Sequence, residues 1–168
     1  MTPTTGSMAR IEGPRKKRAR RIGRVLFIIY MAVLVYFLFF ADWYDHAPGA
    51  QWEYHYNIVP FREILRYIIK ARKIGAAAVL LNLAGNVAGF MPFGFFLPVM
   101  SPAFRGLLKV TGLGFFVSLE VEIVQLLTRS GRCDVDDIIL NTVGAAAGYL
   151  LFLLVNRWRK EVQRRYGR

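Results

Sequence analysis

The sequence predicts an all-α fold: a polytopic membrane protein with a bundle of four transmembrane helices and one interfacial amphipathic helix. Hydrophobic residues make up 55% of the 168 residues and the mean hydropathy is +0.33, whereas soluble proteins average about 45–50% apolar residues. Four largely apolar runs are long enough, at roughly 17–25 residues, to cross a bilayer. Eight of the 23 basic residues precede Val25 and six follow Val155, which is typical of the cytoplasmic flanks of spans. We therefore attribute the net charge of +12 to the membrane setting and expect no nucleic-acid partner.

The first part of the chain predicts a cytoplasmic tail followed by a span. Residues 1–24 form a basic, partly disordered tail in this interpretation. The 17 residues Val25–Ala41 are largely apolar, and Asp42 and Trp43 follow them. This junction is a poor cleavage site, so we expect a retained first span rather than a signal peptide. The segment Asp42–Pro60 is expected to be a loop, whose histidines and acidic residues fit no metal-ligand spacing.

The next segment, Phe61–Lys73, has apolar and basic residues on opposite sides at helical spacing. It is too short and too charged to cross a membrane. It therefore predicts an amphipathic helix that lies on the membrane surface or packs against the bundle.

Three more spans complete the membrane domain, which we place at residues 25–155. They are expected at about residues 74–100, 106–127 and 137–155, and residues 156–168 are expected to form a second basic cytoplasmic tail. Pro92 lies inside the second span and removes one backbone hydrogen bond, so it predicts a kink or a break there. Thr128–Asp136 is expected to be a loop between the third and fourth spans.

Four spans place both termini on the same side of the membrane. With the termini in the cytoplasm, the inner segments hold 16 basic residues and the outer segments hold 7. The positive-inside rule therefore predicts cytoplasmic termini.

In this orientation, polar side chains from three spans and one loop fall at one depth near the outer surface. The predicted ligand-binding residues are Asn82, Asn86, Glu122, Gln125, Arg132, Asp134, Asp137 and Asn141. Within each span the polar residues share one helical stripe. In the fourth span this stripe continues into Gly144 and Gly148, and small residues let helix backbones approach closely. The pattern predicts an outward-facing polar pocket above a tightly packed floor.

The residues leave the chemistry of this pocket open. Asn and Gln commonly bond across helices, and one of the aspartates can cap a helix. Glu122 needs a partner or a proton inside a span, and Arg132 is its natural partner. Glu122 and Asp137 are the candidates for acid–base catalysis. We expect no cofactor, with a divalent cation on the carboxylate oxygens as the open alternative. Cys133, the single cysteine, has no assigned base.

Three spaced motifs make the chain resemble a known family. NLAGNVAGFMPFGFFLP (82–98), SLEVEIVQL (118–126) and RCDVDDIILNTVGAAAG (132–148) are similar to the VanZ-like family of bacterial membrane proteins. The shared pattern is N-x3-N, F-x-P-x-G, S-x3-E-x2-Q and R-x-D-x2-D-x3-N-x2-G, within about Ile58 to Gly148. Its spacing favours Glu122 over Glu120 as the family's glutamate, and the role of Glu120 stays open.

The resemblance implies a multi-pass protein of the bacterial plasma membrane, in a family associated with low-level resistance to the glycopeptide teicoplanin. Its expected partners are membrane lipids and a lipid-linked envelope precursor or a glycopeptide, and an oligomer stays open. We expect a module that recognises a cell-envelope or lipid-linked ligand. The alternatives are a membrane-embedded hydrolase or transferase acting on an envelope lipid, and a small transporter or membrane scaffold. Whether the protein is an enzyme is left open.

Overall fold

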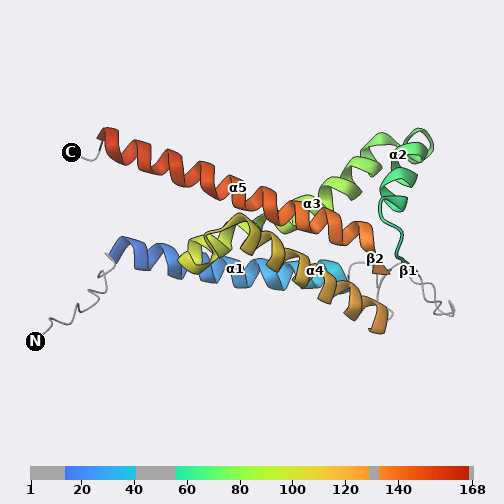
Figure 1. Ribbon diagram of the computed structural model, residues 1–168, viewed down its shortest axis with the longest axis horizontal. Helices are drawn as coiled ribbons and strands as arrows, with labels where there is room; N and C mark the ends of the chain where they lie inside the picture. Colours follow the sequence, from blue (N-terminus) through green and yellow to red (C-terminus); the bar gives the residue numbers. More distant parts are fainter. Residues whose placement is uncertain (1–13, 41–55, 129–132, 167–168) are drawn as a thin grey trace, which may run out of the picture.

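Four long helices lie side by side, and a short fifth helix sits at one end of them (Figure 1). The computed structural model describes residues 14–40, 56–128 and 133–166. The elements are α1 (Pro14–Phe40), β1 (Tyr56–Asn57), α2 (Arg62–Ile74), α3 (Ala76–Met100), the 3₁₀ turn η2 (Pro102–Phe104), α4 (Leu107–Thr128), β2 (Cys133–Asp134) and α5 (Val135–Tyr166). In this part of the chain, α1, α3, α4 and α5 are long and apolar enough to cross a membrane. The predicted all-α fold with four spans is confirmed.

The basic tails of the chain are helical where the structure describes them. The helix α1 begins at Pro14, well before the expected start at residue 25, and α5 continues to Tyr166, past the expected end at 155. The prediction followed hydropathy, which marks contact with lipid. Hydropathy does not mark the end of a helix, because Arg and Lys are good helix formers and a helix can continue through a basic segment. The 32 residues of α5 extend about 48 Å, which exceeds the roughly 30 Å hydrocarbon core.

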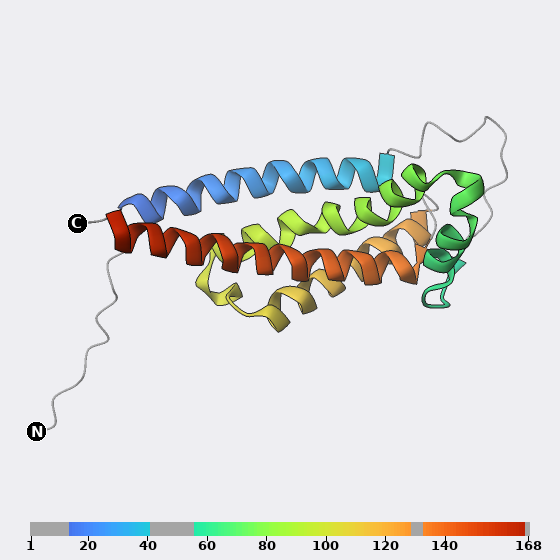
Figure 2. The same cartoon turned by 90° about the horizontal axis from the view of Figure 1, so that it is seen from above.

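The start of α1 and the end of α5 lie at the same end of the molecule, and α2, β1 and β2 lie at the opposite end (Figures 1 and 2). Four spans that alternate in direction produce this arrangement. It separates a highly basic end, with the outer turns of α1 and α5, from the end that holds the predicted polar residues.

The chain turns between α2 and α3 at Gly75, whose φ of 93° is a conformation that L side chains rarely adopt. Its N–H donates to the carbonyl of Ala71 at 2.9 Å and so closes α2. The amphipathic helix expected at Phe61–Lys73 is therefore confirmed, to within one residue. Of the kink or break expected at Pro92, the break is wrong, because α3 runs without interruption from Ala76 to Met100 with Pro92 inside it, and the kink stays a prediction.

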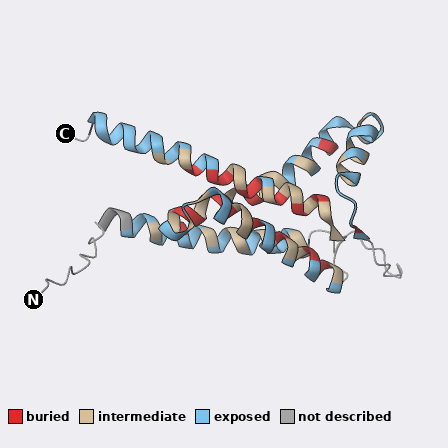
Figure 3. Cartoon of the chain, in the orientation of Figure 1, coloured by how far each residue is buried: buried red, intermediate tan, exposed pale blue. Residues whose placement is uncertain are grey.

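The core lies where α3, α4 and α5 cross, and Figure 3 shows the buried residues gathered there. Glycines set the approach of α5 to α3: a Cβ added at Gly144 would collide with the carbonyl oxygen of Val87, and one at Gly148 with that of Met91. A Cβ at Gly94 would likewise collide with the carbonyl of Ala145. The close packing predicted for Gly144 and Gly148 is thus confirmed, and aromatic side chains such as Phe90 and Phe93 fill the space beside them.

The first span packs on the outside of this core. The Tyr30 hydroxyl donates to the carbonyl of Gly89 in α3 at 2.6 Å, and Gln125 Nε2 in α4 donates to the carbonyl of Leu38 at 2.8 Å. The opposite side of α1 exposes apolar residues such as Ile28 and Phe37. Such a surface suits contact with lipid chains.

Candidate functional site

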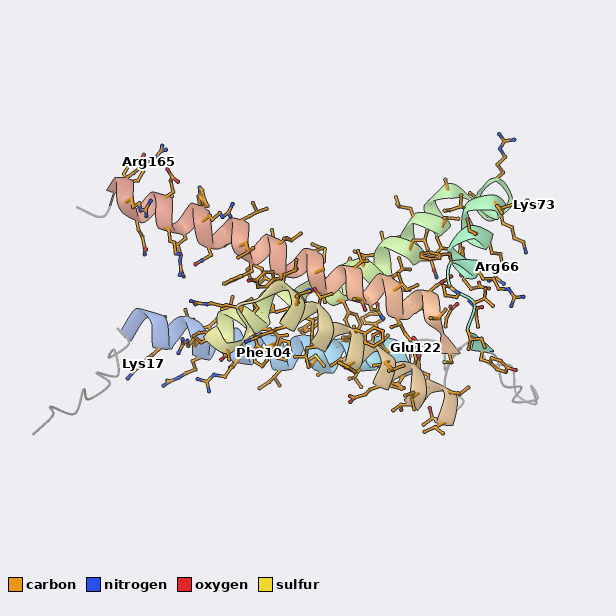
Figure 4. The ribbon with its side chains drawn as sticks, in the orientation of Figure 1. Lys17, Arg66, Lys73, Phe104, Glu122 and Arg165 are labelled. Carbon is orange, nitrogen blue, oxygen red and sulfur yellow. The ribbon has the colours of Figure 1, made fainter. Side chains whose placement is uncertain are left out.

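A cluster of polar side chains lies in the half of the bundle that carries α2, and Figure 4 places Glu122 there, away from Lys17 and Arg165. Buried residues of this cluster come from β1, α4 and α5. They are Asn57, Ser118, Glu122, Gln125, Asp136 and Asn141. Buried polar groups are normally hydrogen-bonded. The hydrogen bonds of each residue therefore show which polar atoms hold the protein together and which atoms could still bind a ligand.

Asp134 joins three elements at the start of α5. Its backbone lies in β2, which pairs in parallel with β1 and sets Asn57 opposite Asp134. Asn57 Nδ2 donates to Asp134 Oδ1 at 3.0 Å, and the N–H of Asp136 donates to the same oxygen at 2.9 Å. The second bond is an N-cap of α5. The expectation that one of the aspartates caps a helix is confirmed for Asp134.

Glu122 is 3% exposed and lies on α4, inside a membrane-spanning helix. Its Oε2 accepts the N–H of Asp134 at 2.8 Å, so it orients the strand that leads into α5. Among the described residues, Glu122 has no cationic partner and its Oε1 accepts no further hydrogen bond. The expected partner, Arg132, lies outside the described residues.

Asp136 is 1% exposed and caps a helix other than its own. Its carboxylate accepts the N–H groups of Phe61, Glu63 and Ile64, the last two at 2.8 and 3.1 Å. These groups are free donors at the N-terminus of α2, where the helix dipole favours negative charge. Phe61 itself has a φ of 65° and offers no side-chain cap. Asp136 therefore caps the N-terminus of α2 and fixes this helix to α5.

Asp137 pairs with the neighbouring span. Asn86 Nδ2 in α3 donates to Asp137 Oδ1. Within the described residues, the second carboxylate oxygen of Asp137 accepts no hydrogen bond. Asn82, one turn before Asn86, is exposed.

The remaining predicted residues hold helices together. Asn141 Nδ2 in α5 donates to the hydroxyl of Ser118 in α4 at 3.0 Å, and both side chains are buried. Gln125 ties α4 to α1 through Leu38. Each of these three side chains has its partner inside the protein, as is common for polar residues between membrane helices.

The structure therefore brings six of the eight predicted residues into one connected region and leaves Asn82 at its exposed edge, while Arg132 is not described. Sequence reasoning missed Asn57 and Asp136 as parts of the region. Asn57 carried no signal. Asp136 carried an indirect one, because the helix that begins after Pro60 has no Ser, Thr, Asp or Asn to cap it.

The chemistry that this geometry allows is set by carboxylates and amides. Among the described residues, no group of three or more His, Cys, Asp or Glu side chains is arranged to hold a metal ion. Cys133 lies beside the cluster, and burial, with the charges of Glu122 and Asp134, raises the pKa of its thiol. A raised pKa lowers the fraction of thiolate at neutral pH, and the thiolate is the nucleophile. Cys133 is therefore poorly suited to nucleophilic catalysis.

We expect maleimide to alkylate Cys133 more slowly in the folded protein than in the denatured chain at pH 7.5, with a rate that rises as the pH increases. At high pH, where the Glu122 carboxyl is ionised, Glu122→Gln removes one of the charges that raise the thiol pKa, so it should accelerate alkylation relative to the wild type. Glu120→Gln is the matched control, since Glu120 is exposed on α4. Equal rates in the two variants would contradict a charge on Glu122 that acts on the thiol.

Four membrane-spanning helices with polar residues buried between them define a multi-pass α-helical membrane protein. The model of the VanZ/LLP1 family matches residues 27–156, most of the chain. The chain belongs to this family, and the resemblance found in its motifs is confirmed. Protein VanZ of Enterococcus faecium is 28% identical over 139 residues, which cover 81% of this chain and 76% of that protein. No solved structure matches the chain.

Proposed function

We propose that the protein recognises a lipid-linked or cell-envelope ligand through Glu122, Asp137 and Asn86, at the end of the bundle opposite to the termini. Its place is the bacterial plasma membrane, with both termini in the cytoplasm and the polar end outside. Membership of the VanZ/LLP1 family supports a link of this recognition to teicoplanin resistance.

One observation carries the proposal: Glu122 is a carboxylate that is 3% exposed within a span, and its Oε1 has no partner among the described residues. A carboxyl group buried inside a membrane span is costly, so such a residue marks a functional site by default. The second oxygen of Asp137, which accepts no bond from a described residue, adds another acceptor beside Asn86. Acceptor oxygens of this kind select ligands that donate hydrogen bonds, such as sugar hydroxyls, amide N–H groups or an ammonium. Arg132 is the candidate donor for an anionic part of the same ligand.

A membrane-embedded hydrolase or transferase is the second candidate, favoured by two neighbouring helices that each supply a carboxylate with an oxygen that has no partner among the described residues. One such carboxylate would act as base and the other as acid. The two functions differ in one respect, because a recognition module binds its ligand and releases it unchanged.

The test uses the purified full chain with a purified lipid-linked cell-wall precursor, and measures binding and product formation together. In a recognition module, Glu122→Gln and Asp137→Asn weaken binding at least tenfold, which is about 1.4 kcal/mol, and the wild type forms no product. Product formation that Glu122→Gln abolishes while binding is kept would favour the enzyme. Wild-type behaviour of both variants in both assays would refute the proposed site.

A further inference from the structure

The short helix α2 does not turn its apolar stripe toward the bundle. The residues on its packed side are Glu63, Ile64, Tyr67 and Ala71, which are partly buried. Leu65, Ile68 and Ile69 share another side at spacings of three and four, and they are 53%, 55% and 77% exposed. The segment before the helix adds Ile58, Val59 and Phe61, which are also more than half exposed. Exposed apolar residues therefore lie along one side of α2 and in the segment before it.

Basic residues flank the apolar stripe of α2. The helix carries five basic residues and one acidic residue, a net charge of +4, and the acidic residue, Glu63, already pairs with Arg66 at 2.6 Å. Arg62, Lys70, Arg72 and Lys73 are exposed. Figure 4 shows Arg66 and Lys73 at the end of the molecule opposite to Lys17 and Arg165. The positive charge of α2 thus lies at the end of the bundle opposite to the termini.

The position of α2 is fixed at both of its ends. Asp136 holds its first turn to α5, and Gly75 turns the chain from its last turn directly into the span α3. With 13 residues, α2 extends about 20 Å and cannot cross the bilayer. A helix held at the mouth of the bundle in this way lies in the plane of the membrane surface.

We propose that α2 and residues 58–61 form a binding surface for anionic phospholipids of the adjacent leaflet. Leu65, Ile68 and Ile69 enter the boundary between headgroups and acyl chains, to a depth of about 5–10 Å. The flanking basic side chains contact lipid phosphates, and each contributes about fivefold to the local affinity for anionic lipid. This inference is independent of the ligand of Glu122, because none of these residues belongs to that cluster.

The test places a spin label at Ile69→Cys or, as the matched control, at Lys70→Cys, in a Cys133→Ser background. The full chain is reconstituted in bilayers of phosphatidylcholine with or without 30% phosphatidylglycerol, a composition chosen for the experiment. With phosphatidylglycerol, the label at 69 should be relaxed by oxygen and protected from a water-soluble nickel complex, and the label at 70 should show the reverse.

Neutralising Arg62, Lys70 and Lys73 to Gln should reduce phosphatidylglycerol retained in native mass spectrometry by at least tenfold. Neutralising Arg157, Arg159 and Lys160 at the other end is the control for general charge.

Two results would overturn the proposal. Exposure of the label at 69 to the nickel complex in both bilayers would show that α2 stays off the membrane. Protection of this label from the nickel complex in detergent, without bilayer lipid, would indicate a protein contact there. Equal phosphatidylglycerol retention in the two triple variants would show that α2 has no preference for anionic lipid.

Discussion

Replacing Asp136 by alanine is expected to destabilise the protein by about 3 kcal/mol and to release the first turn of α2. Three backbone N–H groups of that turn donate to this carboxylate, which is 1% exposed. Alanine leaves those donors without their partner and removes a charge that the helix dipole favours. Phe61, held at a φ of 65°, then loses the contact that keeps it in a left-handed conformation.

Hydrogen exchange measures this effect locally, and thermal unfolding in detergent measures it globally. In Asp136→Ala, the amides of residues 61, 63 and 64 should exchange much faster than in the wild type. The control is Glu63→Gln, at the same end of α2, which removes a partly exposed ion pair to Arg66 and should cost less than about 1 kcal/mol. If both variants unfold at the same temperature, Asp136 does not fix α2 to the bundle.

Replacing Gly148 by alanine is expected to cost about 2–3 kcal/mol, because the added methyl group enters occupied space. It would collide with the carbonyl oxygen of Met91 and approach the backbone N–H of Phe95 within 3.0 Å. Both atoms belong to the backbone of α3, so relief requires moving one helix against the other. Close approach through small residues is a main source of helix association in membranes.

Gly85→Ala and Gly112→Ala are the controls for this prediction, since nothing lies within 4 Å of a Cβ at either position. Alanine there should leave stability unchanged or raise it by up to about 1 kcal/mol, because glycine is a poor helix former. Thermal unfolding of the four proteins in one detergent checks the ranking. A cost at Gly85 equal to that at Gly148 would contradict the close α3–α5 contact.

The spans and the glycine contacts could be predicted from the sequence, and much of the polar network could not. Apolar runs and the spacing of Gly144 and Gly148 are local signals, and the structure follows them. The bond from Phe61 to Asp136 joins residues that are 75 positions apart. No periodicity reports such a pair before the topology is known. Of the kink or break expected at Pro92, the break did not occur: backbone atoms of Met91 and Phe95, on either side of the proline, pack closely against Gly148 of α5.

The hydrogen bonds divide the predicted site residues into two groups. Asn141 and Gln125 have partners inside the bundle and act as links between helices, and Asp134 caps α5. Glu122 and Asp137 keep oxygens that no described residue occupies. Our proposal therefore places ligand recognition on these two carboxylates and stability on the others.

Teicoplanin susceptibility, measured together with the amount of folded protein in the membrane, tests this division most directly. The full chain is expressed in a susceptible bacterium as wild type, Glu122→Gln and Glu120→Gln, each at a matched membrane level. We predict that the wild type and Glu120→Gln raise the inhibitory concentration of teicoplanin, and that Glu122→Gln is folded but gives no protection. Full protection by folded Glu122→Gln would contradict the central claim that this buried carboxylate is the functional group.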